Sequence, residues 1–217
     1  MTDAAQDQTR TGGRLLPEAR RRTAVWLLLG SVVVTAALGV VYAGGRVPGR
    51  VDRPLTSAVN TLLDPHLGLQ RLVLRIADPL PVVLAILALA GYCAIRRRWA
   101  GLVLVLLGPA LALGVTELLK PITGRTIGAD AQWLSYPSGH TTSVSALVVA
   151  AWVLLSGLTR AWRTAQLALS ALVLVAVAST LVGLGYHYPT DIVGGFCVAL
   201  GTVLALALAL DRRSRRA

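Results

Sequence analysis

The sequence predicts an all-α integral membrane protein: a bundle of six transmembrane helices with a short interfacial helical segment. Hydrophobic residues make up 55% of the 217-residue chain and charged residues only 14%, against about 25% charged residues in a soluble domain. The apolar residues fall in six uncharged runs of 17 to 23 residues, close to the roughly 20 that a helix needs to cross a bilayer. The alternation of apolar and polar residues that is typical of membrane β-barrels is absent from the sequence.

The six runs cover residues 24–44, 79–95, 99–116, 141–159, 164–186 and 192–210. A helix is the expected conformation of each, because lipid offers no partner to an unpaired backbone group. The first run follows three arginines, as the apolar core of a signal peptide does. It is longer than the roughly 7–15 residues of such a core, so we expect an uncleaved span.

Basic residues predict the orientation of these spans. Alternate segments of the chain, 1–23, 96–98, 160–163 and 211–217, hold five, three, two and four of the 21 lysines and arginines. Because such residues collect in cytoplasmic loops, we expect a multi-pass protein of the cell membrane with both termini in the cytoplasm. The segments 45–78, 117–140 and 187–191 then face outward, although five arginines between positions 46 and 75 depart from the rule.

The remaining segments complete the predicted organisation. Residues 1–23 are polar and lack periodicity, which predicts a disordered cytoplasmic tail. The membrane domain covers residues 24–210, and residues 211–217 form a basic cytoplasmic tail. Within the domain, loop 45–78 carries spaced apolar residues interrupted by Pro65, which predicts one or two short helices at the membrane interface.

Composition also excludes several classes of function. The net charge of +11 reports topology here, because the sequence shows no aromatic-rich basic module for binding nucleic acid. The two cysteines, Cys93 and Cys197, lie at different predicted depths and form neither a disulfide framework nor a metal-binding pair. We therefore expect the lipid bilayer as a partner, no nucleic acid, no metal and no cofactor.

Three polar clusters, at 117–125, 136–140 and 185–191, all fall on the predicted outer side. Ionisable residues at such positions are costly and usually functional. His187 and Asp191 are four residues apart, which places them on one face of a helix. A carboxylate that binds one imidazole nitrogen leaves the other free as a nucleophile or base. Pro189 suits the first turn of a helix, so we expect the last helix to begin beside His187.

The other two clusters supply groups that suit an anion. Gly139 follows Ser138 directly before the fourth run, and a helix start offers unpaired N–H groups and a positive dipole end. Lys120 and Arg125 add two cations. Together with the imidazole of His140, this set fits phosphoryl chemistry, in which positioning and charge neutralisation do most of the catalysis.

Each of these residues also has a structural explanation when it is taken alone. His140 could be a capped residue at a helix start, the His187–Asp191 pair could tie a loop to a helix, and the two cations could mark the membrane edge. Their joint occurrence on one side of the membrane favours a site. Glu117 lies three residues before Lys120, so we expect these two to form a structural ion pair.

In this order, the three clusters resemble the type 2 phosphatidic acid phosphatase family, lipid-phosphate phosphatases with a vanadium haloperoxidase-like fold. The family pattern is Lys-x6-Arg-Pro, then Pro-Ser-Gly-His, then Ser-Arg-x5-His-x3-Asp. The middle motif matches in full at residues 137–140, and the end of the third matches at His187 and Asp191. The first matches at Lys120, with Gly124 and Arg125 similar to the Gly-Arg that often precedes the Arg-Pro.

The resemblance implies a metal-independent hydrolase that removes phosphate from a phospholipid or a polyprenyl (di)phosphate at the outer face of the membrane. His187 would form a phosphohistidine, Asp191 would orient it, and His140 would protonate the leaving group and then activate water. The residues expected to hold the phosphoryl oxygens are Lys120, Arg125, Ser138 and Gly139.

Two departures from the pattern leave alternatives open. Ile127-Gly128 stands at the Arg-Pro, and Thr180-Leu181 stands at the Ser-Arg. The site would then bind a less charged phosphoryl group, borrow an arginine from 46–75, or belong to a catalytically weak lipid-binding relative. A phosphotransferase with an alcohol acceptor is a further alternative. A transporter is disfavoured, because the runs are continuous and the charges sit at one edge.

Overall fold

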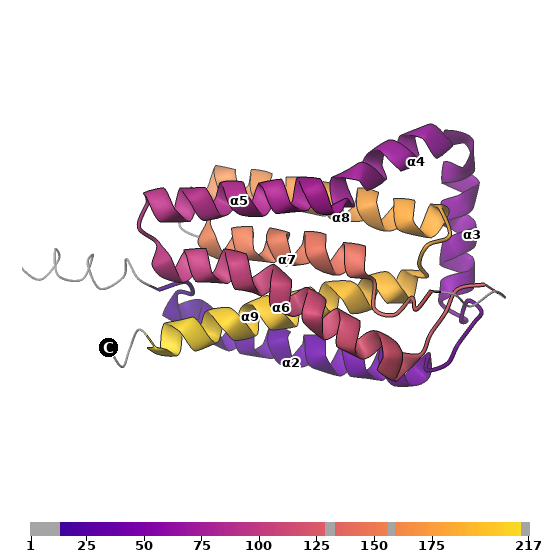
Figure 1. Ribbon diagram of the computed structural model, residues 1–217, viewed down its shortest axis with the longest axis horizontal. Helices are drawn as coiled ribbons and strands as arrows, with labels where there is room; N and C mark the ends of the chain where they lie inside the picture. Colours follow the sequence, from indigo (N-terminus) through magenta and orange to yellow (C-terminus); the bar gives the residue numbers. More distant parts are fainter. Residues whose placement is uncertain (1–13, 129–132, 156–158, 214–217) are drawn as a thin grey trace, which may run out of the picture.

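The computed structural model describes residues 14–128, 133–155 and 159–213. Six long helices run side by side, and shorter helical segments cross one end of the bundle (Figure 1). The elements are α2 (Glu18–Val41), α3 (Asp52–Leu63), η1 (Asp64–His66), α4 (Leu67–Leu74), η2 (Arg75–Ala77), α5 (Pro79–Ile95), α6 (Trp99–Thr123), α7 (Gly139–Leu154), α8 (Arg160–Gly183) and α9 (Pro189–Arg213).

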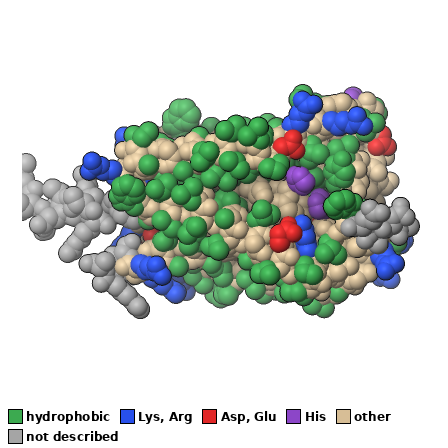
Figure 2. Space-filling model, in the orientation of Figure 1, with side chains coloured by type: hydrophobic (Ala, Val, Ile, Leu, Met, Phe, Trp, Pro, Cys, Tyr) green, Lys and Arg blue, Asp and Glu red, His purple; other side chains and the backbone are tan. Residues whose placement is uncertain are grey.

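The all-α class is confirmed, and a helix lies at each of the six predicted positions. Within the described residues, the β-type pairing is one isolated bridge between Thr126 and Leu134. Hydrophobic side chains cover much of the outer face of the bundle (Figure 2). These features support a multi-pass membrane protein.

Six transmembrane helices are not confirmed. The helices α2, α6, α8 and α9 are long and apolar enough to cross a membrane, and α5 makes a fifth when it is combined with residues 52–77, which meet it at 42°. Helix α7 has 16 residues, about 24 Å at 1.5 Å per residue, which is shorter than the roughly 30 Å hydrocarbon layer.

The segment that was predicted to lie at the membrane interface is helical, as the spacing of its apolar residues predicted. Pro65 lies in η1, between α3 and α4, where it separates the two helices. Helix α3 lies across the end of the bundle (Figure 1), and both α3 and α4 pack against α8. Helix α3 also contacts α9, so this segment reaches the part of the chain that follows His187.

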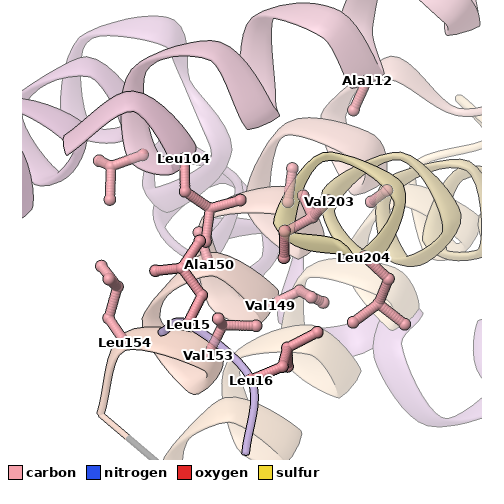
Figure 3. Packing of buried hydrophobic residues seen from close by; sticks show 14 of the residues in the cluster. Leu15, Leu16, Leu104, Ala112, Val149, Ala150, Val153, Leu154, Val203 and Leu204 are labelled. Atoms are coloured by element: carbon pink, nitrogen blue, oxygen red, sulfur yellow. The ribbon is translucent and has the colours of Figure 1, made fainter. Parts of the chain in front are cut away.

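Helix α9 is the centre of the bundle and packs against α2, α6 and α7. Its buried residues Val203 and Leu204 meet Leu104 of α6 and Ala150 of α7 in the main hydrophobic core (Figure 3). Alanines in this core let neighbouring helices approach closely, which is how helices pack in a membrane.

The predicted disorder of residues 1–23 is wrong from residue 14 onward. Leu15 and Leu16 are buried in the main core, and α2 already begins at Glu18. The backbone N–H groups of Leu15 and Leu16 donate to Asp211 Oδ1 at 2.8 Å and Oδ2 at 3.0 Å. A two-residue apolar anchor is too short to give a periodic pattern, so the sequence did not reveal it. Residues 1–13 and 214–217 lie outside the described residues.

Asp211→Ala is expected to loosen this anchor, because it leaves two buried N–H groups without an acceptor. The expected loss is about 2 kcal/mol, which lowers the unfolding midpoint in detergent by roughly 4–8 °C. Arg212→Ala, at an exposed neighbouring position, is the control and should leave the midpoint unchanged. An Asp211→Ala midpoint equal to that of the wild type would contradict the anchoring role.

Candidate active site

A cavity of about 720 Å³ lies between α5, α6 and the start of α7, and two histidines face it (Figure 2). Four of the predicted site residues line this cavity: Lys120, Gly139, His140 and His187. The other three, Arg125, Ser138 and Asp191, are fully buried behind its wall. The structure therefore brings the two imidazoles to one cavity from distant parts of the chain and leaves three of their expected partners out of its lining.

His187 is held by a backbone carbonyl. Its Nδ1 lies 3.1 Å from the carbonyl oxygen of Ser135. Because a carbonyl oxygen only accepts, Nδ1 carries the hydrogen and donates it, and the neutral ring keeps its free lone pair on Nε2. The sequence did not reveal this partner, because any residue can supply a backbone carbonyl.

Asp191 is placed differently from the orienting role that the sequence predicted. Its Oδ2 lies 3.8 Å from His187 Nδ1, too far for a hydrogen bond. That oxygen accepts instead from the backbone N–H of Tyr188 at 2.9 Å. Asp191 is thus a buried negative charge beside the imidazole rather than its nearest acceptor. Pro189 does begin α9, as predicted, so His187 lies two residues before this helix.

Ser138 starts α7, as predicted, but its side chain caps the helix and does not line the cavity. Its Oγ accepts from the Thr141 backbone N–H at 3.4 Å and from the Thr141 hydroxyl at 3.1 Å. Its own N–H donates to the carbonyl oxygen of Asp191 at 3.1 Å. These bonds tie the Pro-Ser-Gly-His segment to the first turn of α9.

Arg125, predicted as a phosphate ligand, is enclosed in a network of buried charges. Its Nη2 lies 2.6 Å from Asp52 Oδ2, and its Nη1 lies 2.5 Å from Asp191 Oδ1. Both carboxylates and the guanidinium are fully buried. The side chain is therefore neutralised and out of reach of the cavity. Asp52 could not be identified as this partner from the sequence, because it lies 73 residues away from Arg125, at the start of α3.

The surroundings of this network shift the pKa values of two groups, the Asp52 carboxyl and the Tyr188 hydroxyl. Burial opposes the ionisation of Asp52, but hydrogen bonds from Thr190 and Arg125 outweigh it and hold the pKa of this carboxyl below its ordinary value. Burial raises the pKa of the Tyr188 hydroxyl. That hydroxyl stays protonated and donates to the backbone carbonyl of Arg46 at 3.3 Å.

Lys120 lies in the last turn of α6 rather than in a loop, because this helix continues to Thr123. The predicted pair with Glu117 is confirmed, with 2.6 Å between Nζ and Oε1. Lys120 is the one lysine or arginine among the described residues that line the cavity. None of the arginines at 46–75 is in that lining.

Apolar side chains occupy both positions at which the motif pattern has arginine. Ile127 lines the cavity. Leu181 is fully buried and packs with Val177, Val144 and Ala77 in a second hydrophobic cluster. Within the described residues, no group of three or more His, Cys, Asp or Glu side chains is placed to hold a metal ion.

The sequence profile described as the PAP2 superfamily matches residues 101–215, more than half of the chain. The chain belongs to the PAP2 superfamily. Membership in this superfamily supports a phosphatase activity. The matched residues include every predicted site residue and extend from α6 to the end of α9.

A solved structure supports the same fold. A transmembrane PAP2-type phosphatidylglycerolphosphate phosphatase from Bacillus subtilis matches with a TM-score of 0.63 and 20% sequence identity, over 88% of this chain and 96% of that chain. At this identity the match shows a shared fold. No curated protein sequence matches the chain.

Gly195→Ala tests how closely the PAP2 motif segment must lie against α9. A Cβ atom at residue 195 would sit 2.5 Å from the carbonyl oxygen of Ser138, so the backbone before His140 must move. A displacement of about 1 Å costs roughly 10²-fold in rate, and we expect a loss of that size in phosphate release. Gly91→Ala in α5 is the control, because nothing lies within 4 Å of its Cβ position. Equal activity in both variants would contradict the close approach.

Proposed function

We propose that this PAP2 protein is a membrane-embedded lipid-phosphate phosphohydrolase that acts through a phosphohistidine at His187. The observation that carries the proposal is the environment of the His187 imidazole, namely its hydrogen-bond partner and the groups that share its cavity. Its Nδ1 is engaged by Ser135, and it shares one cavity with a second histidine and the N-terminus of a helix. This arrangement joins a nucleophile, an acid–base group and an anion site.

The proposed reaction has two steps. In the first, His187 Nε2 attacks the terminal phosphorus, the bond from that phosphorus to the oxygen of the leaving group breaks, and protonated His140 gives its proton to that oxygen. The leaving group is the lipid alcohol of a monoester or the lipid phosphate of a diphosphate. In the second, neutral His140 takes a proton from water, and the water oxygen displaces His187 from phosphorus. Inorganic phosphate leaves, and both imidazoles return to their starting states.

The start of α7 supplies the proposed oxyanion contacts. Ser138 is the N-cap of this helix, so Gly139 and His140 are its first two residues, whose N–H groups have no carbonyl partner within the helix. Lys120 adds a positive charge from α6. Donors that are fixed before the reaction stabilise the charge that builds on the phosphoryl oxygens.

A lipid substrate is supported by the walls of the cavity. Away from the histidines they are formed by Val82, Val83 and Ile86 of α5 and by Leu106 and Leu113 of α6. An acyl or prenyl chain would lie along these side chains while its phosphate contacts His187. The Bacillus subtilis protein of the same fold is a phosphatidylglycerolphosphate phosphatase, which supports the same class of substrate.

The motif pattern has arginine where this chain has Ile127 and Leu181. The charge of the cavity favours one explanation for this difference, which is that the site binds a less charged phosphoryl group. Lys120 shares its charge with Glu117, and Arg125 is neutralised by two carboxylates. Such a site binds a dianionic monoester weakly, because each charge-assisted contact that is lost removes a strong interaction. We propose that the preferred substrate carries its terminal phosphate in a diphosphate linkage, as in a polyprenyl diphosphate, so that the charge is shared between two phosphoryl groups.

The active site is proposed to face outward. It lies at the end of the bundle that α3 crosses, opposite the start of α2 and the end of α9 (Figure 1). With both termini in the cytoplasm, as the basic residues predict, the phosphate is released on the extracytoplasmic side of the cell membrane.

Substitution of each histidine tests this function on the purified protein in detergent. The substrates are phosphatidic acid, phosphatidylglycerolphosphate and a polyprenyl diphosphate, and the readout is phosphate release. We expect His187→Ala to lower the rate about 10³-fold or more, because the nucleophile is lost. His140→Ala should lower it about 10²–10⁴-fold, which is the usual contribution of a general acid–base group.

His66→Ala is the matched control. His66 is exposed in η1 and is absent from the cavity lining, so this variant should keep the wild-type rate. Full activity in His187→Ala would reject the phosphohistidine. Faster transfer of phosphate to glycerol than to water by the wild type would identify a phosphotransferase instead.

A further inference from the structure

We infer that Asp52, on the interfacial helix α3, is a positioning residue that holds His187 in place through Arg125. The inference rests on the proposed function, because it assigns Asp52 a part in the same reaction. Asp52 lies outside the segment matched by the superfamily profile, residues 101–215.

The first step is the buried ion pair between Asp52 and Arg125. Asp52 Oδ2 accepts from Arg125 Nη2 at 2.6 Å, and both side chains are fully buried. The rings of Tyr42 and Tyr188 lie 4.2 Å and 4.7 Å from the guanidinium carbon. A buried guanidinium between two aromatic rings is held by its carboxylate partners, since leaving it unpaired would be strongly destabilising.

The second step is that Arg125 supports His187 along two routes. Through its side chain, Nη1 donates to Asp191 Oδ1, and the other oxygen of this carboxylate faces His187 Nδ1. Through its backbone, the Arg125 carbonyl oxygen accepts from the Ser135 N–H at 2.8 Å. The Ser135 carbonyl oxygen then accepts from His187 Nδ1.

The third step concerns charge. One guanidinium is shared by two carboxylates, so Asp52 balances Arg125 and leaves Asp191 with negative charge to stabilise a positive imidazole. Without Asp52, Asp191 is the remaining carboxylate partner of Arg125, so its negative charge is fully balanced. Its electrostatic stabilisation of a positive His187 imidazole is then weaker in the low dielectric of the interior.

Asp52 also holds the start of α9. Its Oδ1 accepts from the Thr190 N–H at 3.0 Å and from the Thr190 hydroxyl at 2.9 Å. The same carboxylate therefore fixes both Arg125 and the turn that follows His187. This double attachment explains why an acidic side chain is buried at the first residue of an interfacial helix.

The test compares kcat and KM of Asp52→Asn, Asp52→Glu and wild type in proteoliposomes. A misplaced nucleophile slows the chemical step and leaves lipid binding intact, so we expect Asp52→Asn to lower kcat about tenfold with KM within about twofold. Asp52→Glu keeps the charge and should recover part of kcat. Asp64→Asn, an exposed acidic residue in the next segment, is the control and should match wild type.

Wild-type kcat in Asp52→Asn would overturn the inference, and so would a loss that appears only in KM. If Asp52→Asn does not fold, Thr190→Val replaces it. This variant removes the hydroxyl that donates to Asp52 Oδ1 and accepts from Arg125 Nη1, and it keeps every charge. We then expect kcat to fall about threefold, and an unchanged kcat overturns the inference.

A second readout does not depend on activity. The chain has three histidines, so nitrogen-15 labelling of histidine gives a spectrum in which each ring is resolved. Asp52→Asn should shift the ring signals of His187, while His66 keeps its own. The wild type could prove inactive while Asp52→Asn still shifts the His187 signals. That result would reject the proposed function and support the positioning role. Unchanged His187 signals reject the positioning role.

Discussion

The guanidinium of Arg125 is enclosed by two carboxylates and two tyrosine rings, and the arrangement of the site depends on this contact. A buried charge must be paired, because leaving it unpaired in a low dielectric is strongly destabilising. The pairing joins α3, the loop after α6 and the first turn of α9. That loop also contains Ser135, whose N–H donates to the Arg125 carbonyl oxygen and whose own carbonyl oxygen binds His187 Nδ1. The position of the His187 ring therefore depends on where the Arg125 side chain is paired.

The sequence predicted the helices and the two cavity histidines because both leave local signals. Long apolar runs indicate helices in lipid, and polar clusters in an apolar chain indicate a site. The sequence did not predict which polar groups pair with one another. Arg125 looked like a free cation and Ser138 like a ligand, but Asp52 and the Thr141 N–H engage them. Such pairings depend on the tertiary structure, and neither residue type nor spacing encodes them.

The cavity itself differs from a strongly cationic phosphate site. Its cation is Lys120, which is already bound to Glu117, and Ile127 takes the place where the motif pattern has arginine. Attraction by charge is therefore weak, and oriented N–H groups at the start of α7 and apolar walls along α5 and α6 provide the remaining recognition. This balance suits an amphiphile, whose tail contributes to binding and whose phosphate needs mainly to be oriented.

Helix α3 lies across the end of the bundle (Figure 1). We expect the lipid head groups of a bilayer to meet it there. Its first residue, Asp52, is also one end of the series of contacts that reaches His187, the proposed nucleophile. Helix α3 and the proposed reaction centre are thus connected by a continuous series of contacts. In a bilayer, a lateral force on α3 would therefore be transmitted through Asp52 and Arg125 toward His187, so the thickness or curvature of the surrounding leaflet would bear on the geometry of the proposed site.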